Sequence, residues 1–356
     1  MPSLCDLPNE LLTEFARYYP ALYCPLQADA MPLGTQANDY TGVDTLRALA
    51  QTCVHLRAVF QPLLWRDASL YFEPRKPGRY GGTGRRRERK AERKLAALRR
   101  AVDVHGYIRS LTVTLHECTV DNWHPVVELA RVLQCLPRLV TLVITGIRAS
   151  AGSAKNLCAS LMKTAFDGKT FPSVKDLTTD TNDTDIVLAL ESFPRLTALN
   201  MGDMAIQIRV GDLRLIAEYC PHIERLHNIW LPYSNEIDML PELARALSGG
   251  FPKLRYLSLT GGITKECLQG LALCRFRHLE QLTLRYTERV PFTCDAGTTV
   301  RSIVPDALVE DLVAECGRIL TASGAKNRRM VCIEFKQQSW MPRRDRIVET
   351  TETFHF

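Results

Sequence analysis

Apolar residues recur at helical spacing in two stretches near the start of the chain. The first, residues 7–18, places them on one side of a single short helix. The second, residues 44–65, follows the same period and is ended or bent by Pro62. The apolar positions are Leu7, Leu11, Leu12, Phe15 and Tyr18 or Tyr19, and then Leu46, Leu49, Ala50, Cys53, Leu56 and Phe60. We expect a small all-α domain over residues 1–72, with an irregular surface insertion at about 21–43.

A different pattern fills most of the remaining chain. An apolar residue, two further positions, a leucine and usually an alternating apolar position recur seven times, in most copies behind a turn with proline. The clearest copies are LPRLVTLVITGI at 136–147, FPRLTALNMGDM at 193–204, CPHIERLHNIWL at 220–231 and FPKLRYLSLTGGI at 251–263. Weaker copies are found at 106–115, 171–181 and 276–287. Each copy predicts a short strand, because alternation with a period of two is typical of strands.

Helical patterns lie between these strands, and successive copies start 22 to 35 residues apart. Parallel strands joined by helical crossovers at such a period predict an α/β solenoid with a parallel sheet. We assign the solenoid to residues 88–340, after a basic linker rich in proline and glycine at 73–87. A helix from Asp306 and a strand at 330–335 are expected to close the stack, and residues 341–356 are expected to form a C-terminal tail.

The N-terminal domain carries an ordered set of residues. It reads Leu7-Pro8-x-Glu10-Leu11-Leu12, then Asp44-x-Leu46, then Cys53-x-x-Leu56-Arg57, then Leu64-Trp65-Arg66. Over residues 4 to about 70 this order resembles the F-box. Leu56 stands where that family usually has a tryptophan, and about twenty extra residues separate the first helix from the second. LPNELL alone is also an ordinary helix start, so the resemblance rests on the order of the whole set.

The LxxLxL core of the repeated pattern resembles the leucine-rich repeat. The asparagine that this family usually has three positions beyond the last leucine is missing, and Ile147, Met204, Gly262 and Thr287 stand there. Without that side chain the loop backbone needs other hydrogen-bond partners, so we expect irregular repeats. The whole chain resembles F-box proteins with irregular leucine-rich repeats.

The net charge of +6 is concentrated in one segment. Residues 85–100, RRRERKAERKLAALRR, hold nine basic and two acidic side chains, and the other 340 residues sum to about −1. Because a nucleic-acid surface needs basic residues spread over a face of the fold, this distribution argues against nucleic acid as a partner. The segment is either a nuclear-import or anion-binding patch, or the solvent-exposed side of a helix that packs on the rest of the fold. The apolar side of that helix would be Ala91, Leu95, Leu98 and Val102.

Compact catalytic and metal-binding motifs are missing from the sequence. GxSxG, HExxH and GxxxxGK[ST] do not occur, and His116-Glu117-Cys118 lacks a second ligand at helical spacing. The twelve cysteines include no CxxC pair, which suits buried thiols in a reducing compartment. There is no secretory signal pattern and no apolar run of about 18 residues. We expect a soluble cytoplasmic and/or nuclear protein that is not an enzyme, does not meet membranes, and needs no cofactor or metal.

The family resemblance implies a separate function for each of the two domains. The F-box would bind a Skp-type adaptor, and through it a cullin ubiquitin ligase, while the repeats would hold a protein target. The residues implied for the adaptor contact and the packing behind it are Leu7, Pro8, Leu11, Leu12, Leu49, Leu64 and Trp65. Outward-facing strand residues are the target-binding candidates: Arg225, His227, Tyr256, Ser258, Gln281, Thr283 and Arg285. The alternative is a non-catalytic leucine-rich-repeat scaffold whose N-terminal helices only cap the solenoid.

Overall fold

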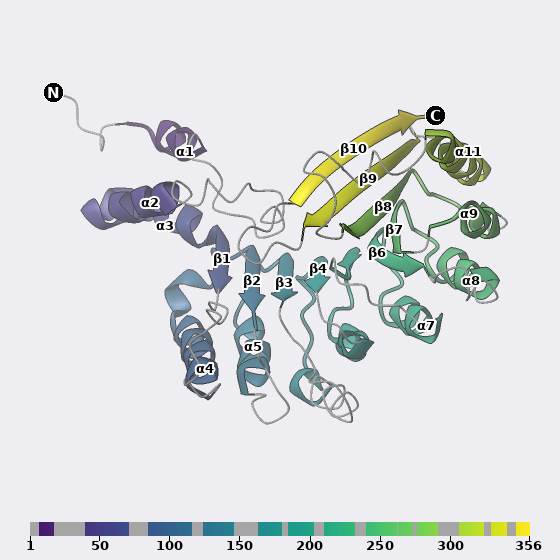
Figure 1. Cartoon of the computed structure of the whole chain (residues 1–356). Coiled ribbons are helices and arrows are strands. Elements are labelled where there is room, and N and C mark those ends of the chain that lie inside the picture. The colour runs from purple at the N-terminus through teal and green to yellow at the C-terminus, as the bar shows by residue number, and fades with distance from the viewer. Residues whose placement is uncertain are drawn as a thin grey trace.

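A computed structural model of the chain gives the arrangement of its helices and strands (Figure 1). The structure describes residues 7–17, 40–70, 85–115, 124–145, 163–179, 184–202, 210–231, 240–261, 263–272, 276–290, 306–323, 329–339 and 347–356. One curved sheet lies inside a layer of helices, and three further helices stand at its N-terminal end. The α/β fold class and the solenoid-like arrangement agree with the sequence prediction.

The N-terminal helices are α1 (Asn9–Arg17), α2 (Tyr40–Thr52) and α3 (Val54–Arg66). They enclose a small hydrophobic core of their own, separate from the core of the sheet. Its buried side chains are Leu12, Leu46, Ala50, Leu56 and Phe60. The pattern at 44–65 therefore forms two helices, and α3 continues through Pro62 instead of ending there. Most of the predicted insertion lies outside the described residues, although its last residues belong to α2.

The break between α2 and α3 falls at Cys53, which caps the N-terminus of α3. Its backbone is extended, and its Sγ accepts a hydrogen bond from the N–H of Leu56 at 3.5 Å. An N-cap residue satisfies one of the first backbone donors of a helix, which have no partner inside the helix. The cysteine that carries part of the family resemblance thus has a local structural role.

The junction between the helices and the sheet lies earlier than the predicted linker at 73–87. α3 ends at Arg66, and β1 (Asp67–Leu70) begins with the next residue. β1 pairs in parallel with β2 (Ser110–Thr114), so the sheet starts inside the predicted domain 1–72. The predicted boundary is corrected because Trp65, Ala68 and Leu70 pack against the core of the sheet, which fixes α3 on its first strand. The last residues of the predicted linker belong to helix α4 (Arg85–Arg100).

The strands form one ten-stranded sheet in sequence order. β1 to β9 are parallel, and β10 runs antiparallel to β9. The remaining strands are β3 (Thr141–Thr145), β4 (Asp176–Thr179), β5 (Ala198–Asn200), β6 (Arg225–Leu231), β7 (Tyr256–Gly261), β8 (Gln281–Val290), β9 (Met330–Ser339) and β10 (Ile347–His355). A strand is present at each of the seven repeated copies and at 330–335, which confirms these predictions.

Helices cover the convex side of the sheet (Figure 1). They include α4, the short 3₁₀ helix η3 (Val102–Val104), α5 (His124–Gln134), η5 (Thr184–Ser192), α7 (Val210–Tyr219), α8 (Leu240–Gly250), α9 (Lys265–Ala272) and α11 (Asp306–Ala322). The helix expected from Asp306 is therefore confirmed. The helical pattern before β5 forms a 3₁₀ helix instead of an α-helix. Crossovers of this kind are required because parallel neighbours cannot be joined by a tight turn.

The repeated leucines form the core between the sheet and these helices. The first apolar position of each copy is buried: Ile108, Leu139, Val174, Leu196, Ile223, Leu254 and Leu279. The leucine three positions later is buried as well: Leu111, Leu142, Leu177, Leu199, Leu226, Leu257 and Leu282. Each such side chain contributes roughly 1.5–3 kcal/mol of hydrophobic stabilisation, so the repeat pattern supplies the driving force that stacks one unit on the next.

The segment predicted as a tail, 341–356, instead ends in a strand of the sheet. β10 pairs with β9 along its full length, from Ile347 opposite Gln338 to His355 opposite Met330. The ring of Phe354 packs against the main core, and the N–H of Phe356 donates to the carbonyl oxygen of Arg329 at 3.0 Å. The sequence did not predict β10 because ETTET is polar at most positions, and the strand depends on pairing with β9.

Candidate functional site

The first candidate surface lies at the start of α1. Leu7 is 39% exposed and Leu11 is 54% exposed, and Pro8 is exposed between them in the sequence. Large aliphatic side chains are usually buried in folded proteins. Three of the seven predicted adaptor-contact residues therefore lie at the surface of the helical unit, within one turn of each other.

The other four predicted adaptor-contact residues are buried or partly buried. Leu12 is 0% exposed in the core of the helical unit, and Leu49 and Leu64 are partly buried against the same core. Trp65 packs against the core of the sheet. Of the seven predicted residues, only Leu7, Pro8 and Leu11 are therefore exposed.

The second candidate surface is the concave face of the sheet, opposite the helices. Of the seven predicted target-binding residues, Arg225 is exposed, and His227, Tyr256, Gln281 and Arg285 are partly exposed. Ser258 and Thr283 are fully buried, which corrects their prediction as contact residues.

Longer side chains hydrogen-bond to Thr283 and cross β7, the strand that contains Ser258. Arg285 of β8 donates through Nη1 to the Oδ1 of Asn228 on β6 at 2.6 Å. β7 lies between these two strands, so this hydrogen bond crosses β7. Tyr256 hydrogen-bonds to Thr283, and Gln281 Nε2 donates to the hydroxyl of Thr283 at 3.5 Å. Short polar side chains are thus covered by their larger neighbours.

A concave-face network links four strands. Asn228 Nδ2 donates to Asn200 Oδ1 on β5 at 2.8 Å, and Arg285 Nε donates to Glu334 Oε2 on β9 at 2.6 Å. Together with the bond from Arg285 to Asn228, this chain of polar contacts runs Asn200–Asn228–Arg285–Glu334. Charge-assisted hydrogen bonds of this length are among the stronger polar contacts in proteins, so the network holds its side chains in fixed positions.

Asn228 sits at an irregularity in β6. The register with β7 shifts between Leu226 and Ile229, and Asn228 has a positive φ of 61°. Non-glycine residues in this conformation are uncommon, and bulges of this kind often occur next to functional sites. The sequence analysis did not select Asn228 or Glu334. A signal for Asn228 was present, because the next apolar residue after Leu226 follows three positions later instead of two.

Two rings and a second ion pair lie beside this network. The His227 and Tyr256 ring centroids are 4.3 Å apart, and Arg225 Nη2 donates to Asp176 Oδ1 at 2.6 Å. Burial lowers the pKa of His227 to about 4, with further lowering from the positive charges of Arg225 and Arg285. Burial also raises the pKa of Tyr256. Both rings are therefore uncharged near neutral pH, and the concave face offers aromatic and hydrogen-bonding groups between two paired arginines.

Reactive chemistry is not evident among the residues that the structure describes. No group of three or more histidine, cysteine, aspartate and glutamate side chains is placed to hold a metal ion within those residues. Burial raises the pKa of Cys220 to about 12 and also raises the pKa of Cys316. Because the thiolate is the nucleophilic form of cysteine, these two thiols are unreactive at neutral pH.

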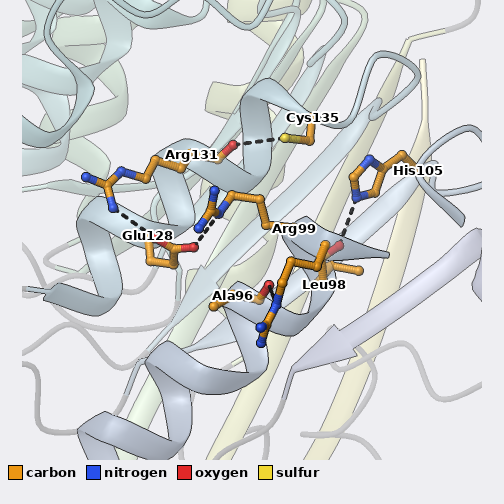
Figure 2. Close-up of polar contacts among 8 residues, drawn as sticks. Ala96, Leu98, Arg99, His105, Glu128, Arg131 and Cys135 are labelled. Atoms are coloured by element: carbon orange, nitrogen blue, oxygen red, sulfur yellow. Dashed lines mark hydrogen bonds and ion pairs between the residues drawn. The ribbon is translucent and has the colours of Figure 1, made fainter. Parts of the chain in front are cut away.

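The basic segment 85–100 forms helix α4, which packs on α5 (Figure 2). Over residues 91–100 of α4, the buried side chains are Ala91, Leu95 and Leu98. Glu128 of α5 accepts a hydrogen bond from Arg99 Nε at 2.6 Å and one from Arg131 Nη1 at 3.2 Å. His105 Nε2 lies 2.8 Å from the carbonyl oxygen of Leu98, behind the end of the helix.

Val102, which the sequence placed on the apolar side of this helix, is instead 73% exposed. The chain changes from the α-helix to the 3₁₀ helix η3 just before it. The tighter 3₁₀ turn changes the rotation per residue, so the helical period that runs through Leu98 no longer applies at Val102.

Comparison with known proteins gives no assignment: no protein-family model matches the chain, and no curated protein matches it. The fold defines the molecule as an α/β protein with a mostly parallel ten-stranded sheet. Among the described residues, none of the helices combines the length and the apolar character needed to cross a bilayer.

Proposed function

We propose that this protein is a substrate-recognition subunit of a Skp-cullin-F-box type ubiquitin ligase. The observation that supports this proposal most directly is the exposure of Leu7 and Leu11 at the start of a helical unit with its own core. Burying two leucines in a partner supplies about 3–6 kcal/mol of gross hydrophobic driving force. The F-box resemblance of the same residues names a Skp-type adaptor as that partner.

In this proposal the concave face of the sheet holds the target. The neutral His227–Tyr256 pair and the paired arginines Arg225 and Arg285 provide an aromatic and hydrogen-bonding surface. Tyrosine and arginine are frequent anchor residues of protein interfaces. The direct connection from α3 into β1 fixes the helical unit on the sheet. A target bound there is held at a constant distance from the adaptor, so the chain acts by proximity and without catalysis of its own.

The first test measures binding of a purified Skp-type adaptor to the intact chain by calorimetry. A Leu7→Asp, Leu11→Asp double variant is expected to lose binding while its circular dichroism spectrum stays unchanged, because both side chains are exposed. Leu12 is unsuitable for this test, since a charge at this fully buried position would unfold the helices.

Val102→Asp, Leu308→Asp is the matched control, because it places the same two charges on exposed aliphatic residues outside the helical unit. It is expected to bind the adaptor as the intact chain does. Failure of the intact chain to bind any Skp-type adaptor would refute the proposal.

A second candidate function is that of a scaffold whose N-terminal helices only cap the solenoid. The packing of Trp65 against the core of the sheet favours it, because a cap must bury residues at the end of the stack. A cap predicts that Leu7→Asp, Leu11→Asp leaves every interaction of the chain intact. The same double variant therefore distinguishes the two functions.

A further inference from the structure

Helix α4 carries a charge distribution that works against its own stability. It begins with Arg85, Arg86 and Arg87, although the positive end of the helix dipole favours acidic residues in the first turn. Two pairs of opposite charge, Arg85 with Glu88 and Arg89 with Glu92, stand three positions apart, but four pairs of basic residues stand four positions apart. Like charges at this spacing lie on neighbouring turns and repel each other.

The structure describes four of the nine basic side chains of α4: Arg93, Lys94, Arg99 and Arg100. Ala91, Leu95 and Leu98 hold the helix on the molecule, and Arg99 is paired with Glu128 of α5. Arg93 and Arg100 are exposed.

We propose that the outer face of α4 is a docking surface for an acidic segment of a partner protein. The charge complementarity is local, since α4 carries a net charge of +7 and the remaining chain about −1. A helix of 16 residues is about 24 Å long, which an extended acidic segment of roughly seven residues would span. Arginines, seven of the nine basic residues, bind carboxylates with two parallel hydrogen bonds.

A protein segment fits this surface better than nucleic acid does. The net positive charge of the chain is concentrated in one helix, and residues 1–72 contain seven acidic and four basic side chains, a net charge of −3. A duplex extends beyond one helix and would meet that negative charge, whereas a short peptide would not. This interaction is independent of the adaptor contact at Leu7 and Leu11.

The test uses three fluorescent probes with the full-length chain: a heptapeptide of glutamate, a heptapeptide of glutamine, and a DNA duplex of about 20 base pairs. At about 50 mM salt the glutamate peptide is expected to bind at least about tenfold more tightly than the glutamine peptide, because exposed charges interact over a longer range at low salt. Arg93→Gln, Arg100→Gln is expected to weaken binding of the glutamate peptide about tenfold.

The control variant is Arg245→Gln, Arg277→Gln, which removes two exposed arginines elsewhere in the chain. Arg245 also matches Arg100 locally, because each Nε donates to the carbonyl oxygen four residues earlier. This control should bind the glutamate peptide as the intact chain does, and both variants should keep the melting temperature within about 2 °C.

Three results would overturn the proposal. Equal affinity for the two peptides would mean that α4 is exposed to solvent and does not bind acidic segments. Tighter binding of the duplex than of the glutamate peptide would assign the helix to nucleic acid. An equal loss of peptide binding in the control variant would show that net charge, and not α4, attracts the peptide. None of these measurements involves a Skp-type adaptor, so each outcome is separate from the proposed function.

Discussion

At the scale of single residues, the concave face is organised by side chains that cross strands. Arg285 contacts Asn228 two strands away on one side and Glu334 on the adjacent strand on the other. Asn228 can accept this contact because its positive φ of 61° and the β6 irregularity move it out of the regular alternation. Replacing a buried partner in such a network leaves the other members unsatisfied, which generally costs more than the bond itself contributes.

His227 gives the clearest prediction at this scale. Its pKa is about 4 in the folded protein, because of burial and the charges of Arg225 and Arg285, and near 6.5 in the unfolded chain. The unfolded chain therefore takes up a proton first as the pH falls below 6.5, and the folded state loses stability down to about pH 4. The expected loss from this one ring is on the order of 3 kcal/mol.

The measurement is the free energy of unfolding in urea at pH 7 and at pH 4.5. The intact chain should lose more stability between the two values than His227→Gln does. His278→Gln, which alters an exposed ring, serves as the control and should follow the intact chain. An identical loss in His227→Gln and in the intact chain would contradict the prediction.

At the scale of elements, burial decides which ion pairs hold helices together. Glu128 is 5% exposed and binds Arg99 of α4 and Arg131 of its own helix. The pair between Arg214 of α7 and Glu242 of α8 is equally short, at 2.7 Å, but both side chains are exposed. Water screens an exposed pair, whereas a buried carboxylate depends on its partners.

Glu128→Gln is therefore expected to lower the free energy of unfolding by about 1–3 kcal/mol, because two guanidinium groups lose their buried carboxylate. Glu242→Gln is expected to change it by less than about 0.5 kcal/mol. Urea denaturation of both variants at pH 7 tests this comparison. Equal effects of the two substitutions would mean that burial does not set the strength of these pairs.

The sequence predicted the strands more completely than the segments around them. Every copy of the repeat produced a strand, because the leucines at its fixed positions have to be buried together. β10 was missed because its residues are mostly polar and its stability comes from β9 and from Phe354 in the core. Val102 was wrongly predicted to lie on the apolar side of α4. The spacing of apolar residues does not reveal that the α-helix changes to a 3₁₀ turn there.

At the scale of the whole molecule, two hydrophobic cores are joined by α3. Phe60 is fully buried in the small core of the helical unit, and Phe193 is fully buried in the core of the sheet, where it packs on Phe166 and Phe171. Among the residues that the structure describes, the helical core contains five buried side chains. A core of this size contributes little to the free energy of unfolding of its unit.

Phe60→Ala is expected to cost about 3–5 kcal/mol, which would open the helical unit locally while the sheet stays folded. Hydrogen exchange followed by mass spectrometry should then show faster exchange in α1 and α2, with β3 to β8 unchanged. Phe193→Ala provides the comparison and should speed exchange across the neighbouring strands. Faster exchange of the whole sheet in Phe60→Ala would indicate one cooperative unit instead of two.

Periodicity, which is local in the chain, determined strands β2 to β9, most of the helices, their order and the leucines of the core. A period follows directly from the geometry of each element and needs no knowledge of what packs against it. Tertiary structure alone decided that Ser258 and Thr283 are covered, that Trp65 joins the larger core, and that the sheet runs from Asp67 to His355. Those outcomes depend on strand register and on side chains that reach over neighbouring strands, and neither is encoded in the spacing of residues along the sequence.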